Sequence, residues 1–223
     1  MALVDAQRKT ARLTSGTDVL SMSAYNLAMG MVVLYGLLMN AIFCYFFSYQ
    51  AMMIMGTRPI IFLIGYFVLV IAGSVIANKS DNPLISFLGY NMIVLPIGII
   101  VSAVVGTSAA PVVMDAIKIT AGIVLVMIGL SCIFPRFFLS LGKALFLSLI
   151  ALIVASLVMM LLGISSIMVS YVAAGIFSLY IGFDIQRAQQ YPRTLDNAVD
   201  CAIDIYLDVI NLFLRILSIL NRD

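Results

Sequence analysis

Long apolar runs, divided by prolines and short polar segments, constrain this chain more than any other feature. A helix that crosses a bilayer needs about 20 mostly apolar residues, whereas a membrane β-barrel shows segments of about 10 residues with alternating polarity. The pattern therefore predicts an all-α integral membrane protein with seven transmembrane helices. We expect these at about 23–47, 60–77, 84–105, 112–134, 137–162, 167–184 and 201–220.

The same pattern predicts the domain organisation. Residues 1–22 are polar and are expected to form a short cytoplasmic tail before an uncleaved first span, and residues 23–223 a single membrane domain. Five of the 6 prolines lie at the breaks, where a missing N–H group costs least: Pro59, Pro83, Pro111, Pro135 and Pro192. Pro96 lies inside the third span and is expected to kink it. The break at 163–166 is the weakest.

Composition excludes several classes of function. The chain is 64% apolar and 10% charged, against about 45–50% and about 25% in soluble domains. A net charge of +2 without a basic stripe argues against nucleic-acid binding. The chain has no histidine, which excludes the usual zinc, haem and Ser-His-Asp sites. The cysteines (Cys44, Cys132 and Cys201) form no CxxC pair and are expected to be small buried hydrophobes. We therefore expect no enzyme and no tightly bound cofactor.

Lys and Arg residues predict the orientation, because they collect on the cytoplasmic side. With the N-terminus inside, the inner segments hold Arg8, Lys9, Arg12, Lys79, Arg136, Arg187 and Arg193. The outer segments then hold only Arg58 and Arg222. This distribution favours a cytoplasmic N-terminus, and the short tails favour a bacterial inner membrane.

Two groups of charged residues fall at membrane depth, where each charge costs about 3 kcal/mol or more. Asp115 and Lys118 in the fourth span are three residues apart, so they share a helix face and can pair. Mutual neutralisation and a role in an ion pathway are the two interpretations of this pair.

The second group lies in the last two spans. Asp184 closes the sixth span, and Asp200, Asp204 and Asp208 follow at four-residue steps, with Asn211 and Arg215 beyond them. Residues 204, 208, 211 and 215 form a polar stripe on an otherwise apolar helix. The stripe fits either a functional face turned inward or an amphipathic helix on the bilayer surface. Its acidic character favours the inward face, because anionic lipid would repel it.

A short loop joins these two helices, so Asp184 and Asp208 are expected to approach each other inside the protein. Two close carboxylates in a low dielectric cannot both ionise cheaply and can share a proton, which makes a pH sensor. When both are ionised, the pair attracts cations. Calcium prefers about 6–8 oxygen ligands, so a few carboxylates with carbonyls and water would form a transit site. Ala174, Ser178 and Gly182 give the sixth span a small-residue face for close packing.

These residues resemble the signature of the Bax-inhibitor (transmembrane Bax inhibitor motif) family. The resemblance rests on 177–184 (FSLYIGFD) and 205–213 (IYLDVINLF), and more loosely on 87–90 and 95–98. It implies six helices around a central C-terminal helix and a pH-sensitive calcium leak, with Asp184 and Asp208 as the sensor and ion pathway. In the family a basic residue before the third span can latch onto the sixth-span aspartate, and this chain has Lys79 there. Bacterial members can associate with membrane quality-control proteases.

Three functions therefore compete. The first is a pH-gated passive leak of calcium or other cations. The second is a membrane protein that does not conduct and instead modulates a protease or another membrane protein. The third, an intramembrane aspartyl protease, is disfavoured because 182–184 (GFD) lacks the expected Gly-x-Gly-Asp.

Overall fold

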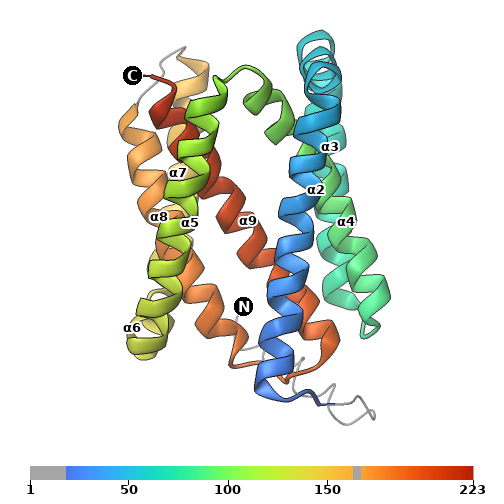
Figure 1. Ribbon diagram of the computed structural model, residues 1–223, viewed down its shortest axis with the longest axis vertical. Helices are drawn as coiled ribbons and strands as arrows, with labels where there is room; N and C mark the ends of the chain where they lie inside the picture. The colour runs from blue at the N-terminus through green and yellow to red at the C-terminus, as the bar shows by residue number, and fades with distance from the viewer. Residues whose placement is uncertain (1–18, 163–166, 223) are drawn as a thin grey trace. The chain divides into compact units, whose positions relative to one another are not determined.

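A computed structural model describes residues 19–162 and 167–222, and its described part is helical without any strand (Figure 1). The helices are α2 (Met22–Thr57), α3 (Pro59–Lys79), α4 (Pro83–Gly106), α5 (Ala110–Ile133), α6 (Pro135–Ser140), α7 (Gly142–Leu161), α8 (Ile167–Ala188) and α9 (Leu195–Leu220). Arg8, Lys9, Arg12 and the expected break at 163–166 lie outside the described residues.

Six helices in the described part of the chain are long and apolar enough to cross a membrane. They are α2, α3, α4, α5, the Gly142–Met159 part of α7, and α8, and they match the first six predicted spans. α9 is equally long but carries four aspartates and an arginine. Whether α9 crosses the bilayer completely therefore stays a prediction.

The helix boundaries differ from the predicted spans at the end of the first span and within the fifth. α2 continues through residues 48–57, because no charge or proline interrupts it before Arg58 and Pro59. The predicted fifth span is divided into α6 and α7 at Leu141. Helix α4 is continuous through Pro96, which is buried inside it.

The chain divides into two compact units by its internal contacts, and they are described separately. The described part of the first unit comprises 19–107 and 188–206, with α2, α3, α4 and the first half of α9. Within it, α4 packs along both α2 and α3. Gly73 and Gly89 bring α3 and α4 together so closely that a Cβ on either would lie 2.5 Å from the other's carbonyl oxygen.

The described part of the second unit comprises 108–162, 167–187 and 207–222, with α5 to α8 and the second half of α9. The Phe138 side chain of α6 fills the space that a Cβ on Gly182 of α8 would need. The Phe183 ring covers Gly142 in the same way, at 2.9 Å from an added Cβ. These two ring-on-glycine contacts fix α8 against the α6–α7 turn, next to Asp184.

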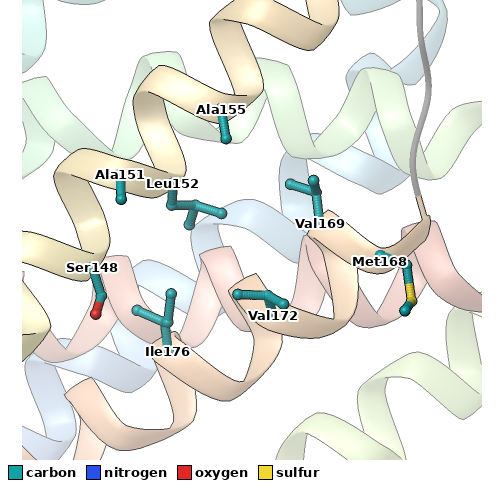
Figure 2. Close-up of a pocket in the computed structure, with 8 residues that line it drawn as sticks. All are labelled: Ser148, Ala151, Leu152, Ala155, Met168, Val169, Val172 and Ile176. Carbon is teal, nitrogen blue, oxygen red and sulfur yellow. The ribbon is translucent and has the colours of Figure 1, made fainter.

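An open apolar hollow of about 360 Å³ lies between α7 and α8. Figure 2 shows Leu152, Val172 and Ile176 at this hollow, with Ser148 as the polar side chain on its wall.

Candidate functional site

Asp184 lies in the last turns of α8 and is 7% exposed. Its carboxylate oxygen Oδ1 lies 3.8 Å from Nη1 of Arg187, which is one helical turn further along α8. Our sequence analysis used Arg187 only to assign orientation and missed this pairing. The three-residue spacing within one helix was the available signal, because residues at i and i+3 are neighbours on a helix surface.

Asp208 lies in the middle of α9 and is also 7% exposed. Tyr180 lies on α8 one turn before Asp184. The described part of the second unit therefore carries a group of two buried acids, one base and one tyrosine on α8 and α9. The tyrosine is a further member of this group that the sequence analysis did not single out.

Polar contacts hold both ends of α8 within its unit. Gln186 is 8% exposed, and its amide nitrogen Nε2 donates a hydrogen bond of 3.4 Å to the hydroxyl of Ser131 on α5. Near the other end of α8, the Ser170 and Ser218 hydroxyls lie 3.4 Å apart, between α8 and α9. The Gln186 contact therefore joins the acidic end of α8 to α5, and the Ser170–Ser218 contact joins the opposite end of α8 to α9.

The polar stripe of α9 is enclosed. Asp200 is 5% exposed, while Asp204, Asn211 and Arg215 are half-buried. Asn211 donates through Nδ2 to the carbonyl of Leu207, at 2.8 Å. No residue of 196–220 is classed as exposed. This burial favours the inward-facing stripe over a helix that lies on the bilayer surface, whose polar face would be open to water.

The start of α9 holds a second buried acid. Asp196 precedes the predicted seventh span at 201–220, but it lies in the first turn of α9 and is 4% exposed. The Ser86 hydroxyl of α4 lies 2.6 Å from its Oδ1 and 3.1 Å from the carbonyl oxygen of Ala77. The Thr194 side chain accepts a hydrogen bond from the Asn197 backbone N–H, which caps the helix. The sequence analysis identified neither this cap nor the serine from α4.

Polar contacts within the first unit tie α9 to α2. The Asn40 amide exchanges two hydrogen bonds with the Tyr206 hydroxyl, at 2.9 and 3.2 Å, and Asn40 is 3% exposed. The Tyr25 hydroxyl lies 3.2 Å from the carbonyl oxygen of Ala188 and 3.4 Å from the Cys201 sulfur. Each of these buried polar groups has a hydrogen-bond partner, which offsets the loss of its contact with water.

The remaining predicted residues lie elsewhere. Asp115 and Lys118 form an ion pair of 3.1 Å on α5, and both side chains are exposed. Lys79 is exposed in the last turn of α3, and its expected role as a latch stays a prediction. The expectation that all cysteines are buried was wrong. Cys201 is buried and Cys44 half-buried, but Cys132 is exposed because it lies on the outward side of α5.

Six long apolar helices together with buried acids on α8 and α9 define an all-helical integral membrane protein. The sequence model of the family described as "Inhibitor of apoptosis-promoting Bax1" matches residues 19–223, and the chain belongs to this Bax inhibitor family.

Two bacterial relatives match part of the chain. An uncharacterized protein of Helicobacter pylori (strain ATCC 700392 / 26695) is 36% identical over 84 residues, which are 37% of this chain and 36% of the relative. An uncharacterized protein of Campylobacter jejuni is 37% identical over 86 residues, which are 38% of this chain and 36% of that relative. The chain thus matches little more than a third of the length of each relative.

Proposed function

We propose that this protein is a passive, pH-sensitive leak for calcium or other cations across the membrane. The observation that carries the proposal is the burial of two carboxylates in the same unit, Asp184 on α8 and Asp208 on α9. Charged groups at membrane depth are costly, so they usually face a water-filled path or a partner.

The chemistry follows from the number of protons that the pair holds. With one shared proton, the pair carries a single negative charge and attracts a cation weakly. With both carboxylates ionised, the pair repels itself and draws cations in. Among the described residues, no group of three or more acid or cysteine side chains could hold a metal ion. Calcium is therefore proposed to pass the pair with help from carbonyls and water, without a tight site.

Arg187 adds a fixed positive charge to this group, 3.8 Å from Asp184. It stabilises ionised Asp184 and competes with an entering cation for that carboxylate. The proposed gate is then an exchange, in which a cation replaces Arg187 beside Asp184. No catalytic role is proposed for any residue. The proposed location is a bacterial cytoplasmic membrane with the N-terminus inside.

Reconstitution in liposomes that contain a calcium dye tests the leak. The wild type is expected to pass calcium at a rate that changes with external pH. Asp208→Asn is expected to remove the pH dependence, whereas Asp81→Asn, in the exposed α3–α4 connection, is expected to retain it. A flux that ignores pH in the wild type, or keeps its pH dependence in Asp208→Asn, contradicts the proposal.

A second candidate function is a non-conducting modulator that binds a membrane quality-control protease or another membrane protein. The far end of α2 favours it, because this helix is uncharged and exposes Tyr45, Phe46 and Tyr49 by 83%, 63% and 68%. Large exposed apolar patches mark interaction sites, in addition to lipid contact. This function predicts no flux in the liposome assay and a stable partner that co-purifies from membranes.

A further inference from the structure

Helix α5 buries one face and exposes the opposite one. The buried residues are Ala116, Thr120, Met127 and Ser131. At 3.6 residues per turn, the opposite side is occupied by Asp115, Lys118, Gly122, Val126 and Gly129, and every one of them is exposed. We refer to these five residues as the α5 face.

The α5 face carries an ion pair at membrane depth. Lys118 and Asp115 are 67% and 59% exposed, and they lie 3.1 Å apart. At a rise of 1.5 Å per residue, they lie about 12 and 8 Å from the start of the 24-residue helix. Lys118 is long enough to reach toward the headgroups, but an aspartate is not. An exposed ion pair here is therefore poorly matched to surrounding lipid.

We propose that the α5 face is a contact between two copies of this chain in the membrane. Two copies inserted with the same topology are related by a two-fold axis along the membrane normal, so the same face of each copy meets the other and every contact between two different residues occurs twice. Asp115 of one copy then lies beside Lys118 of the other, and the reverse contact forms at the same time. The charge pattern is thus complementary to itself, and pairing removes both charges from lipid.

The backbone of α5 permits a close approach. A Cβ placed on Gly122 or on Gly129 would meet no atom within 4 Å, in contrast to Gly182, where Phe138 occupies that space. Glycine stabilises a helix interior less than alanine does. Within a single copy, no close packing requires glycine at these two positions. Small residues on an exposed membrane helix let a second helix pack closely.

Disulfide cross-linking in native membranes tests the contact. Starting from Cys132→Ser, which retains half-buried Cys44 and buried Cys201, one further cysteine is placed on the α5 face by Val126→Cys, or on exposed α7 by Leu147→Cys as the matched control. The exposed fractions of Val126 and Leu147 are 58% and 65%. We expect oxidised dimers from Val126→Cys and none from Leu147→Cys. Equal cross-linking of the two variants overturns the proposal.

Charge variants of Val126→Cys separate a specific contact from chance collision. Asp115→Lys alone and Lys118→Asp alone place like charges opposite each other, and each is expected to reduce cross-linking about tenfold. The double exchange, Asp115→Lys with Lys118→Asp, is expected to restore it, as is co-expression of the two single variants. Gly122→Leu, where a single copy has open space, is expected to abolish it. If all these variants cross-link like their parent, lipid headgroups cap the ion pair and the proposal is wrong.

Discussion

Asn40 of α2 and Tyr206 of α9 hold each other through two reciprocal hydrogen bonds, in a site where Tyr206 is fully buried. The amide and the hydroxyl use both a donor and an acceptor, so neither keeps an unused polar group inside the first unit. The contact joins residues 166 positions apart in the sequence.

Asn40→Leu is expected to lower the free energy of unfolding by about 1–3 kcal/mol, because it leaves the Tyr206 hydroxyl buried without this partner. Thermal unfolding in detergent measures the effect. Asn26→Leu is the control, because Asn26 is exposed on the same helix and its partner Gln189 can bond to water. An equal loss of stability in both variants would mean that the buried Asn40–Tyr206 pair contributes no more than the exposed Asn26 contact.

Gly36→Ala is expected to destabilise the protein by about 1–3 kcal/mol through overpacking. An added Cβ would meet the Tyr90 hydroxyl and lie 2.8 Å from a ring carbon of Tyr206. Gly30→Ala on the same helix has open space at the added methyl group, so it is expected to be neutral or slightly stabilising. Melting temperatures of the two variants in one detergent give the comparison, and similar values would contradict the packing described.

Ser86→Ala removes the hydroxyl next to Asp196 and is expected to cost about 1–3 kcal/mol, since hydrogen bonds to charged groups are the stronger ones. A double-mutant cycle with Asp196→Asn measures how much of the loss belongs to the pair. Ser140→Ala, at an exposed serine of α6, controls for the loss of a hydroxyl. A coupling energy near zero would show that the two side chains act independently.

Arg187→Gln is expected to change the leak without preventing folding, because the Arg187 side chain is 31% exposed. The loss of its charge removes the cation that stabilises ionised Asp184, so we expect the pH of half-maximal calcium flux to move upward. Arg193→Gln, at an exposed position in the α8–α9 connection, is expected to leave that pH unchanged. The readout is liposome flux between pH 5 and 9, and identical pH profiles would exclude Arg187 from the gate.

Apolar run length predicted the helices well, because the energy of burying a span in lipid depends mainly on its composition. It misjudged 48–57, which lay outside the predicted first span. Only Arg58 and Pro59 end that helix. The polar face of α9 was visible from its four-residue spacing, and its burial agrees with the inward orientation that we preferred.

Contacts between distant segments could not be predicted in the same way. Ser86 and Asp196 are 110 positions apart, and no periodicity within either helix selects one as the partner of the other. The exposure of Cys132 was missed for a related reason, since an apolar run does not reveal which of its sides faces the protein. The Asp184–Arg187 pair could have been predicted, because it depends only on the three-residue spacing within a single helix.

The length of α2 has a consequence for the membrane itself. A helix of 36 residues extends about 54 Å, whereas the hydrocarbon layer is about 30 Å thick. Since α2 itself has no charged side chain and only Arg58 follows at its end, we expect it to relieve this mismatch by tilting, by protruding into the headgroups or by thickening the surrounding bilayer. The conformational energy of the protein therefore depends on acyl-chain length, and lipids of different thickness will favour different tilts of its first helix.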